Sequence, residues 1–194
     1  METELYNLRI EFITPVLGTQ PQRDVATEYL AGKSENTTAG LPDDEMETLP
    51  ELLERGTTAF HKLDGRPILY DYMPKAFLKE TGRIFNGLRG VKNLRSKVEN
   101  YVFVKPRRIP LIMPDGAVIE YLERPLRAET AQGPRTSLAR SEMLPEGTYF
   151  ECQLEVFESQ ITKELLADLL SYGKYRGLLQ WRSGGYGRFT FTIE

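Results

Sequence analysis

The sequence predicts an α+β protein with a ferredoxin-like sandwich, and three observations lead to this fold class. Residues 149–156 alternate between apolar and polar side chains, as a half-buried strand does. A helical pattern with an apolar stripe follows, and residues 189–193 return as a strand. Residues 5–122 offer a second strand, helix and strand. Two such β-α-β halves form this fold, so we expect a single domain over residues 1–194.

Composition narrows the possible chemistry. The 194 residues are 40% hydrophobic and 27% charged, which is typical of a globular domain. One cysteine and one histidine can form neither an internal disulfide nor a Cys/His zinc site. No apolar run approaches the roughly 20 residues that cross a bilayer, and the start of the chain is acidic rather than signal-like. We expect a cytoplasmic protein with no membrane contact, no metal and no cofactor.

Charge is divided unevenly along the chain. Residues 1–60 carry four basic and twelve acidic side chains, whereas residues 61–194 carry 21 basic and 16 acidic ones. Residues 75–108 hold ten Lys/Arg against only Glu80 and Glu99. Such a block is either a solvated face or a surface that follows phosphates.

The first strand is expected over residues 5–14, where Tyr6, Leu8, Ile10 and Phe12 share one face. Residues 15–60 then form a long polar and acidic insertion. Within it, residues 49–55 favour a short helix capped by Thr48. A loop of this length is seldom kept without a use, so we expect it to pack, either on its own chain or on another copy.

A helix is expected to begin near Pro74, because proline is tolerated in the first helical turn. Lys75, Lys79 and Arg83 recur at steps of four and therefore line one flank of this helix. Its apolar side chains are Phe77, Leu78, Ile84 and Phe85.

The middle of the chain reads as strands and an exposed arm. Residues 101–104 indicate a buried strand, and residues 109–113 and 117–122 indicate a hairpin across Pro-Asp-Gly. Residues 123–144 are basic and rich in turn residues. We interpret them as an exposed loop or protruding basic arm.

The last third shows the clearest pattern. Phe150, Cys152, Leu154 and Val156 face one way on the predicted strand 149–156, so Cys152 is interpreted as a small core residue. The following helix carries Ile161 and four leucines on one stripe, with Ser159 as the expected cap and Gly173 as its end.

The end of the chain, residues 172–194, combines five glycines, three arginines, three tyrosines and the only tryptophan. Backbone amides of a glycine-rich loop can hold an anion, and arginine with aromatic rings can hold phosphates and stack bases. The alternative is a long turn before an edge strand, with Trp181 and Tyr186 buried against the sheet, Trp181 the more so.

Several short motifs follow one another in the order that one family shows. The first strand ends in Thr-Pro, Met73-Pro74 introduces a helix in which Leu-Lys follows, and residues 145–150 enter a strand as Pro-Glu-Gly-Thr-Tyr-Phe. The glycine-rich residues 177–188 come last. In this order the sequence resembles the RAMP superfamily, the RNA-binding proteins of CRISPR effector complexes, which share a ferredoxin-like core and a late glycine-rich loop.

The helix motif of that family reads Ile-Pro-Gly-Ser-Ser-Leu-Lys-Gly. Residues 73–80 match it at Pro74, Leu78 and Lys79, and conservatively at Met73. The departures are Lys75, Ala76, Phe77 and Glu80, and Leu179 stands where a second glycine is usual. A divergent member, for example one encoded by a phage, would have such a sequence.

The resemblance implies a protein that binds single-stranded nucleic acid, RNA rather than DNA, and assembles as a homo-oligomer or as a subunit of a larger complex. It implies that the arm is a thumb-like hairpin and that aromatic rings of the glycine-rich loop stack on bases. The implied contacts are Lys75, Lys79, Arg83, Arg107, Arg108, Arg127, Arg135, Arg182, Tyr186 and Arg188.

Two alternatives remain open at this stage. Some members of the superfamily cleave RNA, which would make His61 or Asp24 a catalytic residue, although a lone histidine is more often a surface or structural residue. Asp43-Asp44-Glu45 could bind a divalent ion but is more often a solvated run. The other alternative is a protein-interaction or mimic module, in which acidic residues 1–60 of one copy dock on the basic stretch of another or on a partner's nucleic-acid groove.

Overall fold

A computed structural model describes residues 3–21, 23, 26–27, 42–50, 56–130 and 133–194. Its centre is a four-stranded antiparallel sheet in the order β11-β1-β10-β6. These strands are β1 (Glu4–Phe12), β6 (Val102–Lys105), β10 (Tyr149–Val156) and β11 (Phe189–Ile193). Counted along the chain, the order is fourth, first, third, second. That is the ferredoxin-like arrangement, so the predicted fold class is confirmed.

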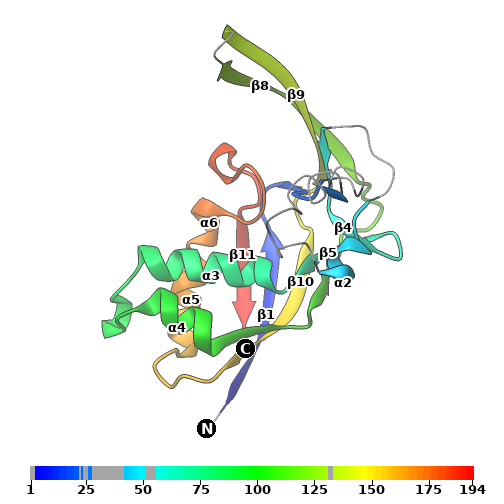
Figure 1. The fold of residues 1–194 in the computed structure, drawn as a ribbon. Helices are drawn as coiled ribbons and strands as arrows, with labels where there is room; N and C mark the ends of the chain where they lie inside the picture. Colours follow the sequence, from blue (N-terminus) through cyan, green and yellow to red (C-terminus); the bar gives the residue numbers. More distant parts are fainter. Residues whose placement is uncertain (1–2, 22, 24–25, 28–41, 51–55, 131–132) are drawn as a thin grey trace.

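Helices cover one face of this sheet (Figure 1). They are α3 (Tyr72–Ile84), α4 (Leu94–Tyr101), α5 (Lys163–Ser171) and the short α6 (Gly173–Arg176). The core lies between the layers, because the apolar side of each strand faces the apolar stripe of the helices. On β1 and β10 the alternation is as predicted, and Cys152 is buried. The predicted stripe of α5, from Ile161 to Leu170, is buried throughout.

Three of the helices differ from the predictions. Helix α3 begins at Tyr72, where the Asp71 carboxylate accepts the Tyr72 N–H at 2.9 Å, and Ile84, expected on the apolar stripe, is 45% exposed. Thr162, not Ser159, caps α5, since its hydroxyl accepts the Leu165 N–H at 3.3 Å. Helix α4 was not predicted. Its eight residues are mostly polar, and only Leu94 and Val98 are buried.

The strand after α4 also differs. Residue 101 belongs to the helix, and β6 alternates between buried and exposed side chains instead of being buried on both sides. This follows because the helices cover only one face of the sheet, so β6 alternates as the inner strands β1 and β10 do.

Insertions between the core strands build a second layer at one end of the sheet (Figure 1). It contains β2 (Val16–Leu17), α2 (Asp43–Met46), β3 (Thr57–Thr58), β4 (His61–Leu63), β5 (Arg66–Tyr70) and β7 (Arg108–Pro110). Strands β4, β5 and β7 form one small sheet, and β2 and β3 flank β9 in another. The hairpin predicted across Pro-Asp-Gly is wrong, because β7 pairs with β5 while the next strand pairs elsewhere. The helix predicted over residues 49–55 lies largely outside the described residues.

The basic segment is a β-hairpin that projects from the body (Figure 1). Strand β8 (Glu120–Thr130) pairs with β9 (Gly133–Leu144) along its whole length. The protruding arm is thus confirmed, and it consists of regular strands rather than an irregular loop. Its root is tied to the second layer through β2 and β3.

Candidate nucleic-acid interface

The flank of α3 carries the predicted cations, although two of them already have partners. Lys79 Nζ lies 2.5 Å from Glu99 of α4, and Lys75 Nζ lies 4.6 Å from the centre of the Phe103 ring. Partial burial, followed by the charge of Lys79, lowers the pKa of Lys75. Arg83 is exposed and shares a shallow groove with Arg95. The flank therefore forms as predicted, with Arg83 its most exposed cation.

The glycine-rich loop, residues 177–188, is joined to α3 by Glu80. The Glu80 carboxylate accepts hydrogen bonds from Arg176 Nε at 3.0 Å and from an Arg182 guanidinium nitrogen. Burial alone would raise the pKa of Glu80, but these two arginines lower it. A carboxylate at position 80 is thus explained by its two arginine partners. This pairing also means that Arg182, a predicted phosphate contact, is paired within the chain.

Residues that directly follow strand β1 hold the same loop in position. The Thr14 hydroxyl donates to the Gly185 carbonyl at 3.0 Å and accepts the Arg188 N–H at 2.9 Å. The Pro15 carbonyl accepts the Gly187 N–H at 2.8 Å. The Thr-Pro pair at the end of β1 therefore fixes the loop in position.

Close packing explains most glycines in this region. A Cβ atom on Gly187 would lie 2.1 Å from the Leu178 carbonyl oxygen, and one on Gly184 would lie 2.5 Å from the Trp181 ring. A Cβ atom on Gly173 would likewise lie 2.3 Å from the Phe189 ring. These positions need glycine because other groups fill the space of a side chain. Gly185, with a φ of +90° and no atom nearer than 3.7 Å, is the more open one.

Aromatic rings of the loop form a stack that reaches the root of the arm. The Trp181 and Tyr186 rings lie 5.0 Å apart at an interplanar angle of 15°, and the Arg124 guanidinium of β8 lies 4.2 Å from the Trp181 ring centre. Trp181 is 37% exposed while Tyr186 is partly buried, the reverse of the order expected for burial against the sheet.

Gln180 adds a second link between loop and arm. Its side-chain oxygen accepts hydrogen bonds from Thr58 of β3 and Ser141 of β9, each at 3.0 Å. We refer to Arg124, Trp181, Tyr186 and Arg188 as the arm–loop surface. The Nε atoms of Arg124 and Arg188 are buried and have no hydrogen-bond partner within the described part of the chain.

Arg107 and Arg108 lie elsewhere, beneath the acidic helix α2. Arg107 donates to Asp44 at 3.1 Å and to Glu45 and Asp71 at 2.9 Å each, and Arg108 donates to Glu47 at 3.3 Å. The acidic run at residues 43–45 is therefore helical, with Asp44 and Glu45 paired to Arg107. The acidic insertion thus pairs with part of the basic stretch of the same chain.

His61 is buried behind this helix. Its Nδ1 lies 3.0 Å from the Thr48 hydroxyl, its ring packs edge-on against Tyr70, and its Nε2 has no partner among the described residues. Burial lowers the pKa of His61 from 6.5 to about 4, so the ring is neutral near pH 7. A 1% exposed, neutral imidazole is poorly placed to exchange protons with a ligand.

The other predicted residues are less informative. Arg127 lies on β8 and Arg135 on β9, within the arm. Asp24 lies outside the described residues. No group of three His, Cys, Asp or Glu side chains in the described ranges is arranged to hold a metal ion. Burial raises the pKa of Cys152 to about 12, so its thiol remains protonated.

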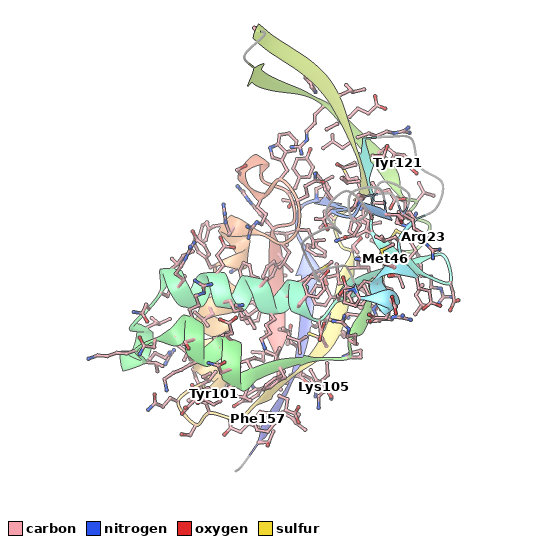
Figure 2. All side chains as sticks on the ribbon, viewed as in Figure 1. Arg23, Met46, Tyr101, Lys105, Tyr121 and Phe157 are labelled. Atoms are coloured by element: carbon pink, nitrogen blue, oxygen red, sulfur yellow. The ribbon has the colours of Figure 1, made fainter. Side chains whose placement is uncertain are left out.

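The open face of the central sheet differs from a base-stacking platform. Arg9 Nη1 is bonded to Glu151 at 2.9 Å, and its guanidinium covers the Tyr149 ring at 3.5 Å. A cavity of about 480 Å³ on this face is lined mainly by polar side chains such as Asn7, Gln153 and Lys105. Figure 2 shows Lys105 at the end of the molecule away from the arm, whereas Tyr121 lies at the root of the arm. RNA-recognition domains stack bases on sheet aromatics, whereas here Arg9 covers the Tyr149 ring and Lys75 lies over the Phe103 ring.

Fold and surface together define a ferredoxin-like α+β protein with a projecting hairpin above a basic and aromatic loop. No protein-family model matches the chain, and no curated protein sequence matches it. The fold is similar to a chain in the "Cryo-EM structure of the Type III-B Cmr-beta bound to cognate target RNA", with a TM-score of 0.52 and 12% identity. The match covers 100% of this chain and 60% of that one, so this chain spans 60% of the other's length.

A chain of a "Type IV-B CRISPR Complex" matches with a TM-score of 0.48 and 13% identity, over 98% of this chain and 90% of that one. At such sequence identities a match shows similarity of fold alone. The similarity of fold is taken from the first match, which has the higher TM-score. Among the described residues, the helices are too short or too polar to span a bilayer.

The sequence pointed to some of these residues and missed others. Tyr186 stacks on Trp181 in the loop, whereas Lys75 and Lys79 of α3 contact β6 and α4. Arg124 and Glu80 were not predicted as part of the site. The signal for Glu80 was a carboxylate within the otherwise basic residues 75–108, in a chain whose later loop is rich in arginine.

Proposed function

We propose that this chain binds single-stranded nucleic acid, RNA in preference to DNA, as a RAMP-like backbone subunit of a larger complex. The observation that carries the proposal is the contact of the arm with the aromatic rings of the glycine-rich loop, which Glu80 in turn joins to α3 beside Lys79 and Arg83. The shared fold with a chain from a complex bound to target RNA supports it.

Phosphates would follow the side chains that keep free donors. Arg83 on α3 is exposed, and Arg188 in the loop has a buried donor without a partner in the described residues. Lys75 and Lys79 line the same flank, with Lys79 exchanging Glu99 for a phosphate. Arg127 and Arg135 would add contacts from the arm. Arg107, Arg108 and Arg182 have a smaller part because carboxylates of the same chain hold them.

Neither alternative has a specific observation in its favour. Ribonuclease activity through His61 would need an accessible imidazole that titrates near neutral pH. Docking of one copy's acidic insertion on another's basic stretch would compete with the contacts between α2 and Arg107 within each chain. We therefore propose binding without cleavage, with copies arranged along the ligand.

Charge reversal tests the proposal. Lys75→Glu combined with Lys79→Glu should weaken binding of labelled single-stranded RNA and flatten the dependence of log K on log salt by about 1.4, since each lost phosphate contact lowers that slope by roughly 0.7. The matched control reverses Arg66 and Lys163, which lie outside this surface. Equal affinity of wild-type, test and control proteins would count against the proposal.

A further inference from the structure

We propose that the Trp181 ring is the binding site for one unpaired nucleobase, which takes the place that the Arg124 guanidinium occupies over the indole. This inference rests on the proposed function and specifies which part of the chain holds a base. It concerns the point where the arm meets the glycine-rich loop.

The indole ring of Trp181 already belongs to an aromatic stack. Tyr186 lies against it at 5.0 Å and nearly parallel, and Gly184 allows the backbone to approach the ring closely. Thr14 and Gln180 hold the loop on either side. Trp181 is therefore preorganised, which lowers the entropy cost of stacking a further planar group.

The Arg124 guanidinium occupies the position over the Trp181 ring that a further planar group would take. A guanidinium is planar and stacks on aromatic rings as a base does, and this one lies 4.2 Å from the ring centre. The Trp181 side chain nevertheless remains 37% exposed, so the ring is accessible from solvent. Among the described residues, Arg124 is held by this stacking and forms no ion pair. A base can therefore displace its guanidinium from the indole without breaking a salt bridge.

Unsatisfied donors next to the stack indicate what should accompany the base. The Nε atoms of Arg124 and Arg188 are buried and lack hydrogen-bond partners in the described residues, a costly condition for charged groups. Phosphate oxygens flanking a stacked base would satisfy such donors. The nearby arginines Arg176 and Arg182 are neutralised by Glu80, so Arg124 and Arg188 supply the charge at this point.

The chemistry favours a nucleobase of a single strand. In a duplex the faces of a base are covered by its neighbours, whereas an unpaired base can lie on an aromatic ring. Stacking needs no hydrogen-bond pattern, so we expect tolerance of sequence, with purines preferred because they cover more of the indole.

Trp181 is the only tryptophan, so its fluorescence reports on this position alone. Titration with single-stranded oligoadenylate should quench the emission of the full chain, with oligouridylate quenching at higher concentration. Binding is measured in parallel by anisotropy of a fluorescein-labelled oligoadenylate, which does not depend on tryptophan. Trp181→Ala should weaken binding roughly 5- to 150-fold, and Trp181→Phe should retain most of it.

Two controls isolate the site. Tyr175→Ala removes an aromatic ring that is 72% exposed but outside the stack, and it should leave affinity unchanged. Arg124→Ala should keep the quenching but reduce the salt dependence, as expected for one lost phosphate contact.

The outcomes separate this inference from the proposed function. Binding by anisotropy with unchanged Trp181 emission would overturn the base site and leave RNA binding intact. Absence of binding by anisotropy would overturn both. If Trp181→Ala fails to fold by circular dichroism, the wild-type quenching and the Trp181→Phe affinity decide the question.

Discussion

Lowering the pH from 7 to 5 should destabilise this protein through His61. The folded chain holds the ring neutral, with its pKa lowered by burial from 6.5 to about 4. The unfolded chain therefore binds a proton between these values while the folded chain does not. The contribution of neutral His61 to the free energy of unfolding is present above about pH 6.5 and decreases as the pH falls toward 4. Its loss between pH 7 and pH 5 amounts to about 2 kcal/mol.

The structure explains this direction. The Thr48 hydroxyl lies 3.0 Å from His61 Nδ1, whereas Nε2 has no partner in the described residues. A second proton on the ring would therefore create a buried charge with an unpaired donor. Most carboxylates titrate below pH 5, so the chosen interval isolates the histidine.

Urea unfolding at both pH values measures the effect, and the His61→Gln variant provides the comparison. Glutamine can bond to Thr48 but does not titrate, so its stability should change much less over this interval. Nuclear magnetic resonance of the only imidazole gives its pKa directly. A midpoint near 6.5, or equal pH dependence in both proteins, would refute the argument and reopen a proton-transfer role for His61.

Two further predictions concern contacts that hold the second layer and the loop. Glu45→Gln should cost about 1.5–3 kcal/mol in urea unfolding because its carboxylate is buried against Arg107, whereas the exposed Glu146→Gln should be neutral. Gly187→Ala should destabilise far more than Gly90→Ala in thermal unfolding, since both have positive φ but only Gly187 faces a carbonyl oxygen at 2.1 Å. Equal losses for the two alanine variants would indicate that the loop relaxes freely.

The core of the fold could be predicted because its signals are local. The alternation of β10 and the stripe of α5 occur within eight to nine consecutive residues, and each reports which side is buried whatever packs against it. Helix α4 gave no such signal. It has two buried side chains and owes its place to packing on α3, where Gly82 lets the α4 backbone approach.

The candidate site was predicted in part for the same reason. Spacing placed Lys75, Lys79 and Arg83 on one flank of a helix, since four residues make about one turn. Whether an arginine remains available depends on carboxylates far away in the sequence. Arg107 is paired with Asp44 and Glu45, and Arg182 with Glu80.

The sequence by itself determined the α+β class, the core strands, the burial of Cys152 and the presence of a projecting basic segment, because periodicity and composition act over neighbouring residues. Only the tertiary structure decided which cations are neutralised, that Arg124 of the arm stacks on Trp181, and that His61 is buried. Ion pairing, stacking and desolvation depend on distances between groups that folding brings together, and no pattern within one segment contains those distances.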